Sequence, residues 1–213
     1  NGLDFVSSVI KDLNISYNVL GEDNIDISKR YIIVSNHPLG GLDGIVLMDL
    51  FGKKFKNIKF VVNDLLYNIE PLKPLFIPIN KYGRQSQEAA IMVDKYYSSN
   101  QQILYFPAGL CSRLVNNQIE DLPWKHSYIN QAIKYKRDIL PVYFEGKNSP
   151  LFYRVANLRK RLKLKFNFET ILLPKEMFKK QNSCFNVIIG EPISYQSIVD
   201  HGKIKDLNNH IRE

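Results

Sequence analysis

The sequence predicts an α/β protein: a single domain over residues 1–213, with a central, largely parallel mixed β-sheet flanked by helices. The first observation is that short apolar, β-rich runs alternate along the chain with segments whose apolar residues recur at helical spacing. Such alternation favours neighbouring parallel strands with helices packed against them. The second is that the 213 residues are 45% hydrophobic and contain no internal repeat, low-complexity tract or linker, which favours one sizeable core.

The N-terminal half begins with an amphipathic helix predicted over 2–13, where apolar side chains recur at Leu3, Val6, Val9, Ile10 and Leu13. The run "YIIVS" has the continuous apolar character of a strand buried on both faces of a parallel sheet. The predicted elements of this half are then strands over 15–21, 31–35 and 58–63 and a helix over 43–51.

The rest of the chain begins with a segment punctuated by prolines, "PLKPLFIPINKYG". Each proline restricts the residue before it, so this segment is predicted to be extended or turning. The periodicity of the remaining chain predicts helices over 84–99, 124–136 and 150–163, strands over 102–107, 139–146 and 184–193, and a helical tail.

The composition limits the partners and the compartment. A formal charge of +8 and a pI near 9.3 favour anionic partners, namely nucleic acid, an anionic membrane, an acidic carrier protein or a phosphorylated cofactor. Cys111 and Cys184 form no CxxC pair, so we expect reduced thiols in a cytosolic protein and no metal site. No apolar stretch approaches the roughly 20 residues of a transmembrane helix. The chain starts without methionine, which leaves room for a preceding N-terminal segment.

The stretch "SNHPLGGLDG", residues 35–44, joins a buried strand to a helix. Functional side chains of such folds collect at the carboxyl ends of strands, where His37 lies. The glycines permit a sharp turn, and Asp43 then falls near the first turn of the helix. A carboxylate that holds one imidazole nitrogen makes the other a general base. The alternatives are a turn histidine, an aspartate that only caps the helix, and a glycine turn that binds phosphate.

Two other segments place polar groups after strands. In "FPAGLCSR", backbone N–H groups around Ala108 to Leu110 are candidates for an oxyanion site, and Ser112 and Arg113 add a donor and a charge. In isolation this segment is equally well a proline-glycine turn. In "FIPINKYGRQS" the polar and basic candidates are Asn80, Lys81 and Arg84, which in isolation fit a solvated loop.

The order of these motifs carries a resemblance. "SNHPLGGLDG", "FIPINKYGR", "FPAGLCSR" and "ILPVYFEG" together resemble the four blocks of the glycerol-phosphate and lysophospholipid acyltransferase superfamily, over residues 31 to about 146. The chain is most similar to a bacterial branch labelled hemolysin-like, and "DLPWKHSYINQAIKYKRDILPVYFEGKNSPLFY" extends the likeness over most of its length. The resemblance implies the glycerol-phosphate acyltransferase-like fold.

The resemblance implies that His37 is the base acting on an acceptor hydroxyl and that Asp43 orients it. Five residues separate the pair here, whereas the superfamily has four, and the Gly-Gly turn would have to absorb the extra one. The third block usually reads Phe-Pro-Glu-Gly-Thr-Arg-Ser, but Ala108 and Cys111 replace its glutamate and arginine. Their loss argues against an ordinary lysophosphatidic acid acceptor and leaves a lyso-aminolipid as the alternative, with Arg113 as a replacement cation.

The implied reaction needs no metal, no cofactor and no covalent acyl-enzyme. The acceptor hydroxyl loses its proton to His37 as it attacks an acyl thioester of acyl carrier protein or coenzyme A, and backbone N–H groups near Gly109 hold the oxyanion. The residues expected to bind substrate are Asn36, Asn80, Lys81, Arg84, Phe106, Pro107, Ala108, Gly109, Ser112 and Arg113.

The segment "RVANLRKRLKLKF" predicts a basic amphipathic helix. Such a helix is typical of a segment lying on an anionic bilayer, although docking of an acidic carrier protein or a solvated face fits as well. The residues expected to dock are Arg154, Arg159, Lys160, Arg161, Lys163 and Lys165. Together with the resemblance, they predict a cytoplasmic protein, peripheral on the inner face of the cell membrane.

Four functions compete with this prediction. An N-acyltransferase or a thioester hydrolase fits the same fold, with an amine or water as the acceptor. A lipid-binding protein without catalysis and a nucleic-acid-binding protein are the others. Because the aromatic residues lie inside apolar runs such as "ILYFP", they indicate core, and no nucleic-acid motif is present. The acceptor, the donor carrier, the acyl chain length and the oligomeric state stay open.

Overall fold

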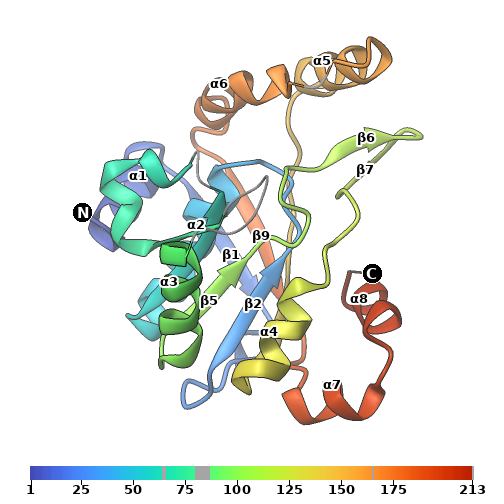
Figure 1. The fold of residues 1–213 in the computed structure, drawn as a ribbon. Helices are drawn as coiled ribbons and strands as arrows, with labels where there is room; N and C mark the ends of the chain where they lie inside the picture. Colours follow the sequence, from blue (N-terminus) through green and yellow to red (C-terminus); the bar gives the residue numbers. More distant parts are fainter. Residues whose placement is uncertain (64–65, 80–86, 165, 213) are drawn as a thin grey trace.

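The centre of the molecule is a seven-stranded β-sheet with the strand order β1-β9-β8-β2-β5-β3-β4 (Figure 1). The computed structural model describes residues 1–63, 66–79, 87–164 and 166–212. The sheet strands are β1 Ser16–Leu20, β2 Tyr31–Ser35, β3 Ile58–Asn63, β4 Phe76–Ile79, β5 Gln102–Tyr105, β8 Asp138–Phe144 and β9 Cys184–Ile189.

Most of the sheet is parallel, as predicted. β2 pairs in parallel with both β5 and β8, and β3 pairs in parallel with β5 and β4. β1 and β9 are parallel to each other, but β9 runs antiparallel to β8. The sheet is therefore mixed, with five strands in one direction and a two-stranded edge in the other.

Helices cover both faces of the sheet (Figure 1). Every residue of β2 is buried, which explains the continuous apolar run in its sequence. One core cluster joins the sheet to α1 and α2, through side chains such as Val6 and Phe51, and a second joins it to α4 through Tyr128 and Ala132. The helices are α1 Leu3–Asp12, α2 Leu42–Phe55, α3 Gln87–Ser98, α4 Ser127–Tyr135, α5 Pro150–Arg161, α6 Leu173–Phe178, α7 Tyr195–His201 and α8 Ile204–Arg212.

Two segments are more regular than the sequence predicted. In the proline-rich segment, Glu70–Leu75 forms the 3₁₀ helix η3 and Phe76–Ile79 forms the strand β4 at the edge of the sheet. Proline has no backbone N–H to donate to the neighbouring strand, and Pro78 is tolerated in β4 because an edge strand has a neighbour on one side alone. The polar stretch after Ser112 forms a hairpin of β6 Arg113–Val115 and β7 Gln118–Glu120. Asn116 and Asn117 both have positive φ, as a tight two-residue hairpin turn requires.

One end of the sheet gathers the predicted functional segments. β2, β5 and β8 are mutually parallel, so the chain that leaves each of them emerges at the same end of the sheet. α5, α6 and the β6–β7 hairpin lie beyond that end (Figure 1). Within the described residues, no helix has both the length and the apolar character needed to cross a bilayer.

Candidate active site

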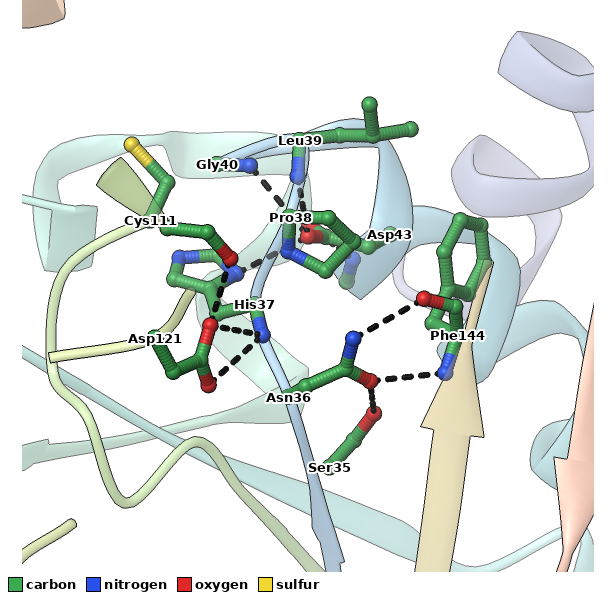
Figure 2. A network of polar contacts seen from close by, with 12 residues as sticks. Ser35, Asn36, His37, Pro38, Leu39, Gly40, Asp43, Cys111, Asp121 and Phe144 are labelled. Atoms are coloured by element: carbon green, nitrogen blue, oxygen red, sulfur yellow. Dashed lines mark hydrogen bonds and ion pairs between the residues drawn. The ribbon is translucent and has the colours of Figure 1, made fainter. Parts of the chain in front are cut away.

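His37 and Asp43 meet in the structure. His37 Nδ1 lies 3.0 Å from Asp43 Oδ2, and the side chains are 12% and 0% exposed (Figure 2). Because Nδ1 is occupied by the carboxylate, the neutral imidazole carries its proton there and presents Nε2 as the basic nitrogen. Nε2 has no partner among the described residues. The pair therefore has the arrangement of a general base with an orienting carboxylate.

The conformation of the loop between His37 and Asp43 explains how two residues separated by five others come into contact. Gly40 has φ +83°, a conformation that costs glycine little, and Gly41 precedes the first turn of α2. Asp43 lies inside that turn and points back along the chain. Its Oδ2 also accepts the backbone N–H of Leu39 at 2.8 Å and of Gly40 at 3.2 Å. Asp43 thus holds the turn as well as the imidazole.

The environment of Asp43 keeps it ionised. Complete burial disfavours the charged carboxylate, but the nearby His37 and the N–H groups of Leu39 and Gly44 outweigh that effect. The pKa of Asp43 is consequently lowered from its ordinary value. A negative charge at this position would stabilise a protonated imidazole at His37.

The segment after β5 packs against the histidine. The Phe106 ring stacks on the imidazole with 4.0 Å between ring centroids and 18° between planes. The N–H of Ser112 donates to the carbonyl oxygen of His37 at 2.8 Å. Two predicted motifs, 70 or so residues apart in the chain, therefore form one site.

The same segment contains a tight turn with free backbone donors. Gly109 N–H donates to the Phe106 carbonyl oxygen at 3.0 Å, and Gly109 has φ +67°. The Pro107 carbonyl oxygen accepts the N–H of Lys125. In the described part of the chain, nothing accepts the N–H groups of Ala108 and Leu110. The two N–H groups flank Gly109 and are candidates for binding an anion.

Three predicted substrate-binding residues are engaged elsewhere. Asn36 spans β2 and β8: its amide donates to the Phe144 carbonyl oxygen at 2.9 Å and accepts the Phe144 N–H at 2.7 Å (Figure 2). The Ser112 hydroxyl donates to Asp121 at 2.5 Å. Arg113 donates to Glu169 at 2.8 Å and to the Cys111 carbonyl oxygen, and only 7% of it is exposed. These side chains shape the site but are not free groups within it.

Asp121 is a site residue that sequence reasoning missed. Its two carboxylate oxygens accept the backbone N–H of His37, each at 3.2 Å (Figure 2). They also accept the Ser112 hydroxyl and, at 2.9 Å, the Trp124 indole N–H. One side chain thus joins the histidine turn to the segment after β5. Its only sequence signal was its position at the start of "DLPWKH".

Cys111 lies in the site but is unsuited to be a nucleophile. Burial raises the pKa of its thiol, although Arg113 lies 3.1 Å from Sγ and opposes the shift. The thiol therefore stays neutral at physiological pH, whereas the thiolate is the reactive form. Both cysteines are free in the structure, as expected.

The remaining predicted residues divide into two groups. Asn80, Lys81, Arg84 and Lys165 lie outside the described residues. Of the expected docking residues, Arg159 forms an ion pair with the buried Glu169 at 2.9 Å. The exposed ones are Arg154, Lys160, Arg161 and Lys163.

A histidine held by a buried carboxylate, at the carboxyl end of a parallel sheet, is an arrangement suited to removing a proton from a substrate. The family model described as "Acyltransferase" matches residues 2–213. The chain belongs to this acyltransferase family, within the glycerol-phosphate and lysophospholipid acyltransferase superfamily, and is an acyltransferase. The resemblance drawn from the motifs is confirmed.

The relatives include two curated bacterial proteins, both named lyso-glycine lipid O-acyltransferase. The chain is 43% identical to the protein of Bacteroides thetaiotaomicron over 197 residues, which cover 92% of this chain and 72% of the relative. It is 42% identical to that of Phocaeicola vulgatus, covering 92% and 71%. The fold is similar to the crystal structure of PlsC, the 1-acyl-sn-glycerophosphate acyltransferase of Thermotoga maritima. The TM-score is 0.61 at 15% identity, and the match covers 99% of this chain and 76% of PlsC. The predicted fold is confirmed.

Proposed function

We propose that this acyltransferase moves a fatty acyl group from an acyl thioester to the hydroxyl of a lysolipid-type acceptor, with His37 as the general base. The observation that carries the proposal is the 3.0 Å contact between His37 and the fully buried Asp43. It is supported by the names of the two curated relatives, which are lipid O-acyltransferases.

The reaction begins when the acceptor hydroxyl gives its proton to His37 Nε2 and its oxygen attacks the thioester carbonyl carbon. The carbonyl oxygen becomes an oxyanion, for which the N–H groups of Ala108 and Leu110 are the candidate donors. When the carbonyl re-forms, the carbon–sulfur bond breaks and the thiolate leaves. The imidazolium returns its proton to that sulfur, so the products are an ester and a free thiol. Asp43 stays ionised throughout and stabilises the imidazolium.

The acceptor we propose is a lyso-aminolipid of the lyso-glycine type rather than lysophosphatidic acid. Ala108 and Cys111 occupy the positions where the superfamily motif has its glutamate and arginine. Arg113, the candidate replacement, is paired with Glu169. The described site thus lacks the arginine expected for an acceptor phosphate, and the 43% identity to a lyso-glycine lipid enzyme supports the alternative.

The donor in this proposal is a thioester of acyl carrier protein or coenzyme A, with no metal or other cofactor. The acceptor is a lipid, so we place the protein on the inner face of the cell membrane. The basic residues Arg154, Lys160, Arg161 and Lys163 fit an anionic surface.

The proposal is tested by a mass-spectrometric acyl-transfer assay. Both thioester donors are offered with lyso-glycine lipid, lyso-ornithine lipid and lysophosphatidic acid, using the wild type, His37→Ala and the exposed control His126→Ala. We expect a new ester with lyso-glycine lipid that His37→Ala reduces at least about 100-fold. Free fatty acid alone would indicate a hydrolase, and an amide product an N-acyltransferase. Turnover unchanged in His37→Ala would exclude the proposed base.

A further inference from the structure

The segment 150–180, which comprises α5, the 3₁₀ helix η4 Phe168–Leu172 and α6, carries nearly all of the net charge of the protein. We call it the platform. It contains nine lysines and arginines against two glutamates, which accounts for seven of the eight net positive charges of the chain. Glu169 and Glu176 are 0% and 2% exposed and are paired with cations. All the exposed charges in the described part of the platform are therefore positive.

The platform also exposes large apolar side chains. Leu151 and Leu158 of α5 and Leu162, which follows its last residue, are spaced by seven and four residues, so they form one stripe along the helix. They are 48%, 56% and 58% exposed, and Phe152 and Ala156 on the opposite side are buried. The platform holds eight of the sixteen large apolar side chains that are exposed in the described chain, a concentration typical of an interaction surface. The other five are Leu164, Phe166, Phe168, Ile171 and Phe178.

The inner side of the platform is part of the active-site region. Phe152 and Tyr153 of α5 pack with Cys111 in a small buried cluster. The two carboxylate oxygens of Glu169 bind Arg113 of the site and Arg159 of α5, at 2.8 and 2.9 Å.

Two further contacts reach the histidine turn itself. The Asn148 amide, just before α5, donates to the Pro38 carbonyl oxygen at 3.1 Å. A Cβ atom on Gly40 would come within 2.8 Å of the Leu173 side chain, so α6 lies directly against the turn. The platform is thus attached to the histidine turn, and its helices α5 and α6 lie beyond the same end of the sheet (Figure 1).

We propose that the platform docks this protein on an anionic bilayer, with its apolar side chains inserted among the lipid tails and its cations against the headgroups. The inference rests on the proposed function only for the identity of the acceptor. Charge complementarity selects an anionic partner, because no exposed carboxylate opposes the cations in the described platform. Apolar tips spread over three short elements fit a deformable apolar layer better than a shaped protein groove.

The first test is sedimentation with vesicles of phosphatidylglycerol and phosphatidylethanolamine. The variant is the double substitution Phe166→Gln and Ile171→Gln, at side chains that are 67% and 70% exposed. The matched control is Ile27→Gln with Ile91→Gln, which are 72% and 60% exposed but lie outside the platform. We expect the platform variant to lower the partition coefficient at least about tenfold and the control to leave it unchanged. Lys160→Gln with Arg161→Gln should weaken binding mainly at low salt.

A second measurement locates the inserted side chains. An environment-sensitive fluorophore is attached to Ile171→Cys or, as control, to Ile27→Cys, each with Cys184→Ser to remove the exposed native thiol. We expect vesicles to shift the emission to the blue only at position 171. Equal binding of the platform and control double variants, or equal shifts at both positions, would overturn the inference.

The competing occupants give different outcomes. Binding of acyl carrier protein that is lost in the Phe166 and Ile171 variant, without vesicle binding by the wild type, would overturn the inference in favour of a carrier site. A concentration-dependent dimer in sedimentation velocity that the same variant dissociates, again without vesicle binding, would identify a second copy of the chain as the occupant.

Vesicle binding needs no turnover, so an inactive wild type that still binds through the platform would contradict only the proposed function. A failure of membrane docking can likewise be distinguished from a failure of catalysis. With a short-chain, water-soluble acceptor the platform variant should turn over like the wild type.

Discussion

At the residue scale, the proposed chemistry depends on which nitrogen of the His37 imidazole is occupied. Asp43 takes Nδ1 and is itself fixed by backbone N–H groups of its own turn. Phe106 covers one face of the ring. The imidazole therefore has little freedom, and Nε2 is the ring nitrogen that the described residues leave for the proposed proton transfer.

Asp43→Asn is expected to reduce kcat by about 100- to 10,000-fold, because an amide neither stabilises the imidazolium nor fixes the same tautomer. The measurement is steady-state acyl transfer on protein shown to be folded by urea unfolding. Asp12→Asn, at an exposed position on α1, serves as the control. Wild-type turnover in Asp43→Asn would contradict the orienting role.

Asp121→Asn is expected to lower kcat about tenfold while changing KM little, because it weakens the support of the His37 backbone without touching the imidazole. It should also cost about 1–3 kcal/mol of stability, since hydrogen bonds to a charged acceptor are lost. Trp124 is the single tryptophan and bonds to Asp121, so its emission should change. Glu120→Gln, an exposed neighbour, should change none of these, and a kcat effect of equal size there would argue against a positioning role for Asp121.

At the element scale, a buried ion-pair network joins three pieces of chain. Glu169 of η4 accepts from Arg113 at the start of β6 and pairs with Arg159 of α5. Two cations thus compensate one fully buried carboxylate.

Glu169→Gln is expected to destabilise the protein by about 3–5 kcal/mol, because it leaves two guanidinium groups without their buried counter-charge. The free energy of unfolding is measured by urea denaturation followed by circular dichroism. The exposed Glu191→Gln is the matched control and should lie within about 0.5 kcal/mol of the wild type. If Glu169→Gln lowers the free energy of unfolding as little as this control does, the network contributes little to stability.

At the scale of the whole molecule, buried carboxylates connect stability to pH. Asp43, Asp49 and Glu176 all have lowered pKa values in the fold: burial opposes ionisation, and their cationic and hydrogen-bonding partners overcome it. The partners of Asp49 are Lys53, Tyr17 and Ser7. A group with a lowered folded pKa adds stability above its unfolded pKa and loses it as pH falls through the folded value.

The free energy of unfolding is therefore expected to be steady from pH 7 to about 5 and to fall as pH drops below about 4, where the unfolded carboxylates bind protons first. Urea midpoints between pH 7 and 3 measure this. Asp49→Asn should flatten the acid slope, whereas Asp12→Asn should leave it nearly unchanged. An acid slope in Asp49→Asn as steep as in the wild type would mean that Asp49 does not contribute to it.

Much of the fold was predictable because its signals are local. The strand over 31–35 was predicted with the bounds it has, since burial on both faces requires a continuous apolar run. The helix predicted over 43–51 extends to Phe55, because its last turn is amphipathic rather than uniformly apolar. The antiparallel edge of β1 and β9 was not predicted: its pairing joins strands more than 160 residues apart, and neither sequence indicates a direction.

By itself, the sequence determined the alternation of most of the strands and helices, the position of His37 at the end of a buried strand, and the presence of Asp43 six residues later. All three are local features, because they depend on the periodicity of apolar residues and on turns of a few residues. Only the tertiary structure decided that Asp121 accepts the backbone N–H of His37, 84 residues away in the chain. It likewise decided that Glu169 binds Arg113, 56 residues away. It also decided which side of the basic helix faces outward. Such contacts arise when separate elements pack, and a carboxylate or an arginine in an otherwise polar stretch carries no local mark of its distant partner.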